Sequence, residues 1–259
     1  MALKQLLDLS GRTALITGGS RGLGLQIATA YGEMGARVCI SARKSDELEA
    51  ACTQLRAQGI DSSWIAADAA REDDLARLAR EAVTRLGHVD ILVNNAGATW
   101  GAPTEDHPIE AWDKVMNLNI RGVFLLTQAI GKSCMIPRRF GRIVNVASIA
   151  GLLGNPPQLM SSIAYNTSKG ALVNFTRALA TEWGHHNITV NALAPGFFPS
   201  KMTQGIIAHF GVEALSRLAP LERIGDDEDL KGAALLFASE AGKHITGQIL
   251  AVDGGASVY

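Results

Sequence analysis

The stretch Thr17-Gly18-Gly19-Ser20-Arg21-Gly22-Leu23-Gly24 decides the fold, because it joins an apolar run to an amphipathic one. The preceding run, Thr13–Thr17, is typical of a β-strand, and the following stretch, Leu23–Met34, is typical of a helix. Glycines permit a tight turn, and the start of a helix presents unpaired N–H groups with a partial positive charge. Any tight turn from strand to helix favours glycine, but this placement after the first strand predicts a phosphate-binding turn.

The same alternation of strand and helix continues along the chain. Further strands are predicted at Arg37–Ser41, Ser63–Ala66, Asp90–Val93, Gly141–Ala147, Ile188–Leu193 and Gln248–Val252. Further helices are predicted at Asp46–Gln58, Asp73–Leu86, Trp112–Met135, Ala164–Gly184 and Glu228–Ala238. Most strands are continuously apolar, as parallel strands are when helices cover both faces. The pattern predicts an α/β fold with a doubly wound, seven-stranded parallel Rossmann sheet.

Composition favours one globular domain over residues 1–259. The chain is 47% hydrophobic and 19% charged, and it has no linker, repeat or low-complexity block. A formal net charge of -1 gives no electrostatic reason to expect nucleic acid or an anionic membrane surface as a partner. No apolar run approaches the ~20 residues of a membrane helix, and the first residues do not read as a signal peptide. We therefore expect a cytoplasmic protein.

Metal chemistry is not indicated. The three cysteines are scattered, which favours reduced thiols, and none of the six histidines has metal-ligand spacing. Two irregular stretches, Gly151–Ile163 and Pro195–Gly225, follow predicted strands. Ligands bind open α/β sheets at that edge, so both stretches are candidates for functional loops. The part from about 197 to 225 is predicted to cap a small-molecule substrate.

Several motifs follow the glycine turn in order: Asn94-Asn95-Ala96-Gly97, Asn119, Ser148, Tyr165 with Lys169, Pro195-Gly196, and Val252-Asp253-Gly254-Gly255. With these motifs the sequence resembles the short-chain dehydrogenase/reductase family in its single-domain form, from about Leu9 to Gly255. The resemblance implies an NAD(P)-dependent oxidoreductase acting on CH–OH or C=O groups. Members of the family are commonly homotetramers.

The resemblance assigns the catalytic roles to Asn119, Ser148, Tyr165 and Lys169. Tyr165 and Lys169 stand at i and i+4 on one predicted helix, so they share a face. A free tyrosine has a pKa near ~10, and the Lys169 ammonium with an oxidised nicotinamide would lower it. Tyr165 is thus the expected general acid of reduction and base of oxidation. Ser148 would hold the substrate oxygen, and Asn119, rather than Asn117, would hold a water beside Lys169.

The cofactor choice follows from charge. An NAD site usually has an acid near the end of the second strand, whereas NADP needs a cation for its 2′-phosphate. Here Arg43 and Lys44 end that strand with no acid at the turn, and Arg21 lies on the same rim. Two solvated surface arginines are the alternative. The predicted cofactor is therefore NADP(H).

Other cofactor contacts rest on the resemblance. Asp68 would accept a hydrogen bond from the adenine amino group, although an Asp at this turn could simply cap the next helix. Asn94 would be a structural bridge between strands. The predicted cofactor-binding residues are Gly18, Ser20, Arg21, Gly22, Leu23, Gly24, Arg43, Lys44, Asp68, Asn95, Ala96, Gly97, Tyr165, Lys169, Pro195, Gly196, Phe198 and Ser200. Phe198 (backbone) and Ser200 (hydroxyl) would meet the carboxamide.

The substrate is less determined by the sequence. Asn95–Gly101 and Pro199–Thr203 resemble 3-oxoacyl reductases and equally gluconate 5-dehydrogenases. Lys201 and Arg217 could serve a sugar acid, but apolar neighbours such as Phe197 favour an acyl thioester. The segment between Ser148 and Tyr165 is longer than the family pattern, with the extra residues at Asn155–Met160, so the pocket wall differs. A non-catalytic NADP(H)-binding regulator is the alternative of another class.

Overall fold

The protein is described by a computed structural model that covers residues 2–156 and 160–258. Its strands are β1 (Thr13–Thr17), β2 (Arg37–Ala42), β3 (Ser62–Ala66), β4 (Ile91–Asn94), β5 (Gly141–Val146), β6 (Ile188–Pro195) and β7 (Ile249–Val252). They form one seven-stranded sheet in the order β3-β2-β1-β4-β5-β6-β7, and every neighbouring pair is parallel. The predicted doubly wound Rossmann sheet is confirmed.

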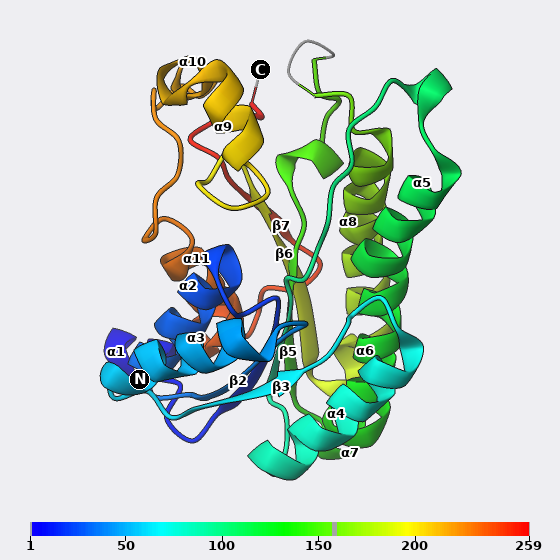
Figure 1. Ribbon diagram of the computed structural model, residues 1–259. Helices are drawn as coiled ribbons and strands as arrows, with labels where there is room; N and C mark the ends of the chain where they lie inside the picture. Colours follow the sequence, from blue (N-terminus) through cyan, green and yellow to red (C-terminus); the bar gives the residue numbers. More distant parts are fainter. Residues whose placement is uncertain (1, 157–159, 259) are drawn as a thin grey trace.

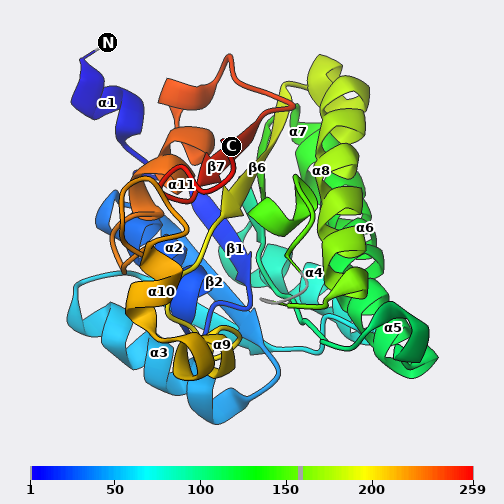
Figure 2. The same ribbon diagram turned by 90° about the horizontal axis from the view of Figure 1, so that it is seen from above.

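Helices cover both faces of this sheet (Figures 1 and 2). One layer holds α2 (Gly22–Glu33), α3 (Ser45–Ala57) and α11 (Lys231–Ala238), with α1 (Leu3–Leu7) at its margin. The other holds α4 (Glu72–Leu86), α5 (Ile109–Met116), α6 (Gly122–Ile130), α7 (Ile136–Arg138) and α8 (Ile163–Trp183). Two short helices, α9 (Gln204–Phe210) and α10 (Val212–Ser216), lie between β6 and α11.

The buried core has two parts, one on each side of the sheet. On β1 the side chains of Ala14 and Ile16 pack with α2, α3 and α11, whereas Leu15 faces α4, α6 and α8. Because successive side chains of a strand point to opposite faces, both faces need apolar residues. This explains the continuously apolar strands of the sequence.

The predicted helix over Trp112–Met135 is longer and less regular than expected. It runs as α5, α6 and α7, separated by two π-helical turns at Asn117–Arg121 and Gly131–Met135. A side chain at Gly122 would lie 2.1 Å from the Ala69 carbonyl oxygen, and one at Gly131 would lie 2.2 Å from the Trp183 ring. The π turns therefore border the places where this helix approaches its neighbours most closely.

The predicted helix over Glu228–Ala238 was placed too early. The Asp226 carboxylate accepts hydrogen bonds from the backbone N–H groups of Glu228 and Asp229, which makes a turn, and α11 begins at Lys231. The stretch Pro195–Gly225 contains short helices between loops, as predicted. Within the described residues, no helix combines the length and the apolar character needed to cross a membrane.

Candidate active site

A cleft of about 870 Å³ lies at the carboxyl edge of the sheet. Its wall takes residues from the ends of β1 to β6 and from the segment that follows β6. Strand β1 lies between β2 and β4. The strands β2 and β3 are added on one side of β1, and the strands from β4 to β7 are added on its other side. This reversal is where doubly wound sheets bind ligands.

The glycine turn forms the floor of one end of the cleft. Gly18 and Gly22 have φ of +64° and +55°, which L side chains rarely adopt. A Cβ at Gly24 would lie 2.3 Å from the Gly18 carbonyl oxygen, whereas a Cβ at Gly22 would meet only Ser200, at 4.0 Å. The turn is tightly packed below and open above, which leaves room for a pyrophosphate at the start of α2.

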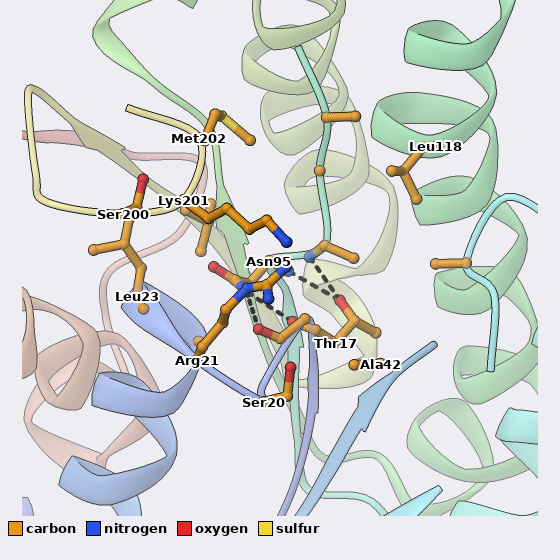
Figure 3. A pocket seen from close by; sticks show the side chains of 18 of the residues that line it. Thr17, Ser20, Arg21, Leu23, Ala42, Asn95, Leu118, Ser200, Lys201 and Met202 are labelled. Atoms are coloured by element: carbon orange, nitrogen blue, oxygen red, sulfur yellow. Dashed lines mark hydrogen bonds between the residues drawn. The ribbon is translucent and has the colours of Figure 1, made fainter. Parts of the chain in front are cut away.

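Asn95 and Thr17 hold this turn against β4. The Asn95 amide donates to the carbonyls of Thr17 and Gly18 at 2.9 and 3.0 Å. The Thr17 hydroxyl accepts from the backbone N–H groups of Asn95 and Ala96 (Figure 3). Sequence reasoning missed Thr17; its place directly before the first glycine was the signal.

The cationic rim is less simple than the sequence indicated. Arg21 Nη1 lies 3.0 Å from both carboxylate oxygens of Glu47, and Lys44 Nζ lies 3.1 Å from Glu47 Oε1. Arg43 is exposed on the cleft wall, and no ion pair joins it to another of the described residues. The turn after β2 contains no acid, but Glu47, in the first turn of α3, also lines the cleft.

Asp68 lies on the same wall, after β3. Its carboxylate accepts a hydrogen bond from Ala70 N–H at 3.0 Å, whereas α4 begins only at Glu72 and its first turn receives no cap from Asp68. The alternative that Asp68 caps the helix is therefore wrong, because it stabilises the turn before the helix instead.

Tyr165, Ser148 and Lys169 meet at the other end of the cleft. Ser148 follows β5 and interacts with the Tyr165 phenol, and its hydroxyl accepts a hydrogen bond from Ala150 N–H at 3.1 Å. Lys169 lies one turn beyond Tyr165 on α8, with Nζ 5.6 Å from the centre of the Tyr165 ring. Its ammonium donates to the Val146 carbonyl at 2.7 Å.

Burial shifts both ionisable groups toward their neutral forms. Burial raises the pKa of the Tyr165 phenol, and the Ser148 hydrogen bond opposes this rise. Burial also lowers the pKa of Lys169 to about 8. Among the residues of the chain, Ser148 is the group that opposes the effect of burial on this pKa.

Asn119 connects three parts of the site. Its side-chain oxygen accepts from Ala98 N–H, and its amide donates to the Ala98 carbonyl and to Ser168 Oγ, at 2.8 to 2.9 Å. Gly97 lies beside it: a Cβ there would stand 3.4 Å from Asn119 Oδ1 and 3.6 Å from Lys169 Nζ. Ser168 was missed by sequence reasoning, and only its position next to Lys169 hints at a role.

Asn94 has the bridging role that was predicted. Its amide donates to Asn145 Oδ1 on β5 at 2.9 Å and to the Thr127 hydroxyl on α6 at 3.1 Å. Below the cleft, Gly196 packs against β7: a Cβ there would lie 2.8 Å from Asp253 Cβ. This contact places the Pro195-Gly196 motif directly beside the Val252–Gly255 motif.

The segment after Gly196 lies over the cleft. Phe198 is buried, and its carbonyl accepts from the Thr203 hydroxyl, which also lies 3.0 Å from Ser200 Oγ. The Thr203 hydroxyl therefore contacts both residues that are predicted to bind the nicotinamide carboxamide, Phe198 and Ser200. In the described part of the chain, no group of three or more His, Cys, Asp or Glu side chains is placed so that it could hold a metal ion.

The described part of the longer segment before Tyr165 contacts the start of α8. Asn155 donates to Ser162 Oγ and to Asn166 Oδ1, which ties the segment to the start of α8. Pro157, Gln158 and Leu159, part of the predicted insertion, lie outside the described residues.

A glycine turn at one end of a cleft and a Ser–Tyr–Lys group at the other are typical of a nicotinamide-dependent oxidoreductase with a Rossmann fold. The short-chain dehydrogenase family model matches residues 12–209, and the chain belongs to that family. It is 37% identical over 259 residues to gluconate 5-dehydrogenase of Gluconobacter oxydans, covering 100% of this chain and 99% of that protein.

Two further relatives bear on substrate and cofactor. The rhamnolipid-biosynthesis 3-oxoacyl-(acyl-carrier-protein) reductase of Pseudomonas aeruginosa is 40% identical over 255 residues, covering 96% of this chain and 97% of that protein. A gluconate 5-dehydrogenase of Burkholderia cenocepacia, solved with NADP and tartrate, has a TM-score of 0.93 at 32% identity, with 100% of both chains covered.

Proposed function

We propose that the chain is an NADPH-dependent carbonyl reductase and secondary-alcohol dehydrogenase, acting on a 3-oxoacyl thioester. The observation that carries the proposal is the placement of Ser148, Tyr165 and the buried Lys169 ammonium together in the same cleft as the glycine turn. The cofactor supplies or accepts a hydride. The residues of this chain must then hold the substrate oxygen and move one proton.

Each residue has a distinct role in that proposal. Ser148 holds the substrate oxygen, and the Tyr165 phenol donates its proton to that oxygen during reduction. Burial raises the pKa of the phenol, so it is protonated at neutral pH, as a proton donor must be. Lys169 binds the ribose hydroxyls from its buried position and passes the proton on, while Asn119 fixes the loop at Ala98.

NADP(H) as the cofactor is supported by the cationic rim and by the NADP complex of the Burkholderia relative. Arg43, Arg21 and Lys44 would hold the 2′-phosphate, and the backbone of the glycine turn, Gly18 to Gly24, would hold the pyrophosphate. Asp68, Asn95, Ala96 and Gly97 lie along the cleft between them and would contact the adenosine. Pro195, Gly196, Phe198 and Ser200 would contact the carboxamide.

An acyl substrate is favoured by the neighbourhood of Tyr165. Leu118 and Met202 line the cleft, and Arg217, one of two cations considered for a sugar acid, pairs with Glu213 outside the cleft wall. Lys201, the other, lowers the pKa of Glu47 at the opposite, cationic end. Both observations leave the substrate end apolar rather than cationic.

Gluconate 5-dehydrogenase-like activity is the second candidate, and one observation favours it. Thr99 Oγ1 lines the cleft and is buried with no hydrogen-bond partner among the described residues. A buried hydroxyl without a partner suits a polar substrate.

The test is NADPH oxidation with acetoacetyl-CoA and, separately, with 5-ketogluconate. We expect turnover of the thioester to have the larger kcat/KM. Turnover of the sugar acid alone would reverse the order of the two candidates.

Tyr165→Phe separates an enzyme from a non-catalytic NADP(H)-binding regulator. The variant should bind NADPH as the wild type does and lose at least ~100-fold in turnover. A wild-type protein that binds NADPH and reduces neither substrate, with no change on substitution, would favour the regulator.

We also propose that residues 1–259 form one domain that assembles as a homotetramer in the cytoplasm. The family resemblance supports the assembly, and Phe124 on α6, a large apolar side chain that is 47% exposed, supports burial of that helix in an interface. Sedimentation equilibrium measures the assembly directly.

A further inference from the structure

Glu47 occupies the centre of the cationic end of the cleft. Four cations line this end, Arg21, Arg43, Lys44 and Lys201, and Glu47 is the acid among them. It contacts Arg21 through both carboxylate oxygens at 3.0 Å and Lys44 at 3.1 Å. Figure 3 shows the Lys201 side chain extending over the same part of the cleft as Arg21.

The Glu47 carboxylate is ionised at neutral pH. The hydrogen bond from Lys44 lowers its pKa, and the charges of Arg21 and Lys201 act in the same direction. Its side chain is only 25% exposed, against 50% for Arg21 and 60% for Lys44. Arg21 and Lys44 therefore pair with the Glu47 carboxylate of the protein itself.

A 2′-phosphate and this carboxylate compete for the same donors. The phosphate of NADP(H) needs Arg21 and Lys44 as partners, and a dianion placed among them is repelled by Glu47. In NAD(H) the ribose carries a 2′-hydroxyl at this position, and a carboxylate readily accepts a hydrogen bond from that hydroxyl. The Glu47 carboxylate thus disfavours the binding of NADP(H) and favours the binding of NAD(H).

We propose that Glu47 is a specificity-determining residue that lowers the preference of this site for NADP(H) over NAD(H). The proposal rests on the proposed binding of NADP(H), and it gives Glu47 a role opposite to that of Arg43. Arg43 has no ion pair within the described chain and attracts the phosphate, whereas Glu47 holds two other cations back from it.

The test compares wild type, Glu47→Gln and Glu49→Gln by direct binding of NADPH and NADH, followed through nicotinamide fluorescence. Glu49 is the matched control because it lies on the same helix but pairs with Arg56 and Trp64. Glu47→Gln should bind NADPH roughly 3- to 10-fold more tightly, with NADH binding unchanged or weaker. Glu49→Gln should change neither affinity.

Calorimetry with 2′-AMP and 5′-AMP gives a readout without nicotinamide. Glu47→Gln should bind 2′-AMP more tightly and 5′-AMP equally. Unchanged or weaker binding of NADPH and 2′-AMP, or equal changes for both cofactors, overturns the role of Glu47. A wild type that binds NADH better than NADPH overturns the proposed cofactor instead, so the two failures are distinguishable.

Discussion

The side-chain amide of Asn119 donates a hydrogen bond to Ser168 Oγ over 2.9 Å, and Ser168 in turn donates to the Tyr165 carbonyl at 2.8 Å. Asn119 lies in the π-helical turn between α5 and α6, and Ser168 precedes Lys169 on α8. The bond therefore joins two helices at the level of Tyr165 and Lys169, the proposed catalytic pair. Both side chains are fully buried, so water cannot replace the bond without a cavity.

Removal of this link should impair turnover as well as folding. Asn119→Ala loses three hydrogen bonds, one buried and two part-buried, so we expect a loss of about 2 kcal/mol in the free energy of unfolding and at least ~10-fold in kcat. Ser168→Ala should cost about 1 kcal/mol and less activity. Urea unfolding and steady-state kinetics measure both, with Ser133→Ala, an exposed serine between α6 and α7, as control. Wild-type turnover in Asn119→Ala would contradict the positioning role.

Burial of Lys169 predicts a stability that depends on pH. Its pKa is about 8 in the fold, below the 10.5 of a free lysine, so between these values the unfolded chain binds more protons. The lysine therefore destabilises the fold below pH ~8, and this cost disappears as the pH rises to ~10.5. The difference corresponds to roughly 3 kcal/mol.

Lys169→Met isolates that contribution. The variant should be more stable than wild type at pH 7, and its advantage should shrink steadily between pH ~8 and ~10.5 in urea titrations. An advantage that stays constant over this range would show that the amine is not held near a pKa of about 8.

Gly151 should be essential to the geometry beside Lys169. A Cβ at this position would lie 2.5 Å from the Lys169 carbonyl carbon and 2.6 Å from its oxygen, so Gly151→Ala must push α8 away from Ser148. We expect at least ~10-fold loss of kcat, since a small misplacement of reacting groups is costly. Gly154→Ala is the control, because its Cβ would meet nothing within 4 Å. Equal activities in the two variants would contradict this role.

Arg43→Asp should move the cofactor preference toward NAD(H). The substitution removes a cation from the proposed 2′-phosphate site and supplies an acid for the ribose hydroxyl, so we expect roughly 10- to 100-fold weaker NADPH binding. Arg80→Asp makes the same change of charge on the exposed side of α4, away from the cleft, and should have no effect. Unchanged NADPH affinity in Arg43→Asp would refute the assignment.

Local periodicity determined much of the fold and part of the site. The apolar strands and the glycine turn depend on neighbours in sequence, so β1, α2 and the i, i+4 pair of Tyr165 and Lys169 could be read directly. The π turns and the late start of α11 could not, because they depend on a close approach at Gly122 and on the Asp226 turn. Periodicity carries no information about such contacts.

The sequence by itself determined which groups the chain carries: a glycine turn after β1, a tyrosine and a lysine on one helical face, and cations after β2. Only the tertiary structure decided the burial, the pKa shifts and the ion pairs of these groups. It buries Lys169, and it brings Glu47 to Arg21, 26 positions apart in the chain. The physical reason is that pKa shifts and ion pairs depend on distance and burial in space, which spacing along the chain does not fix.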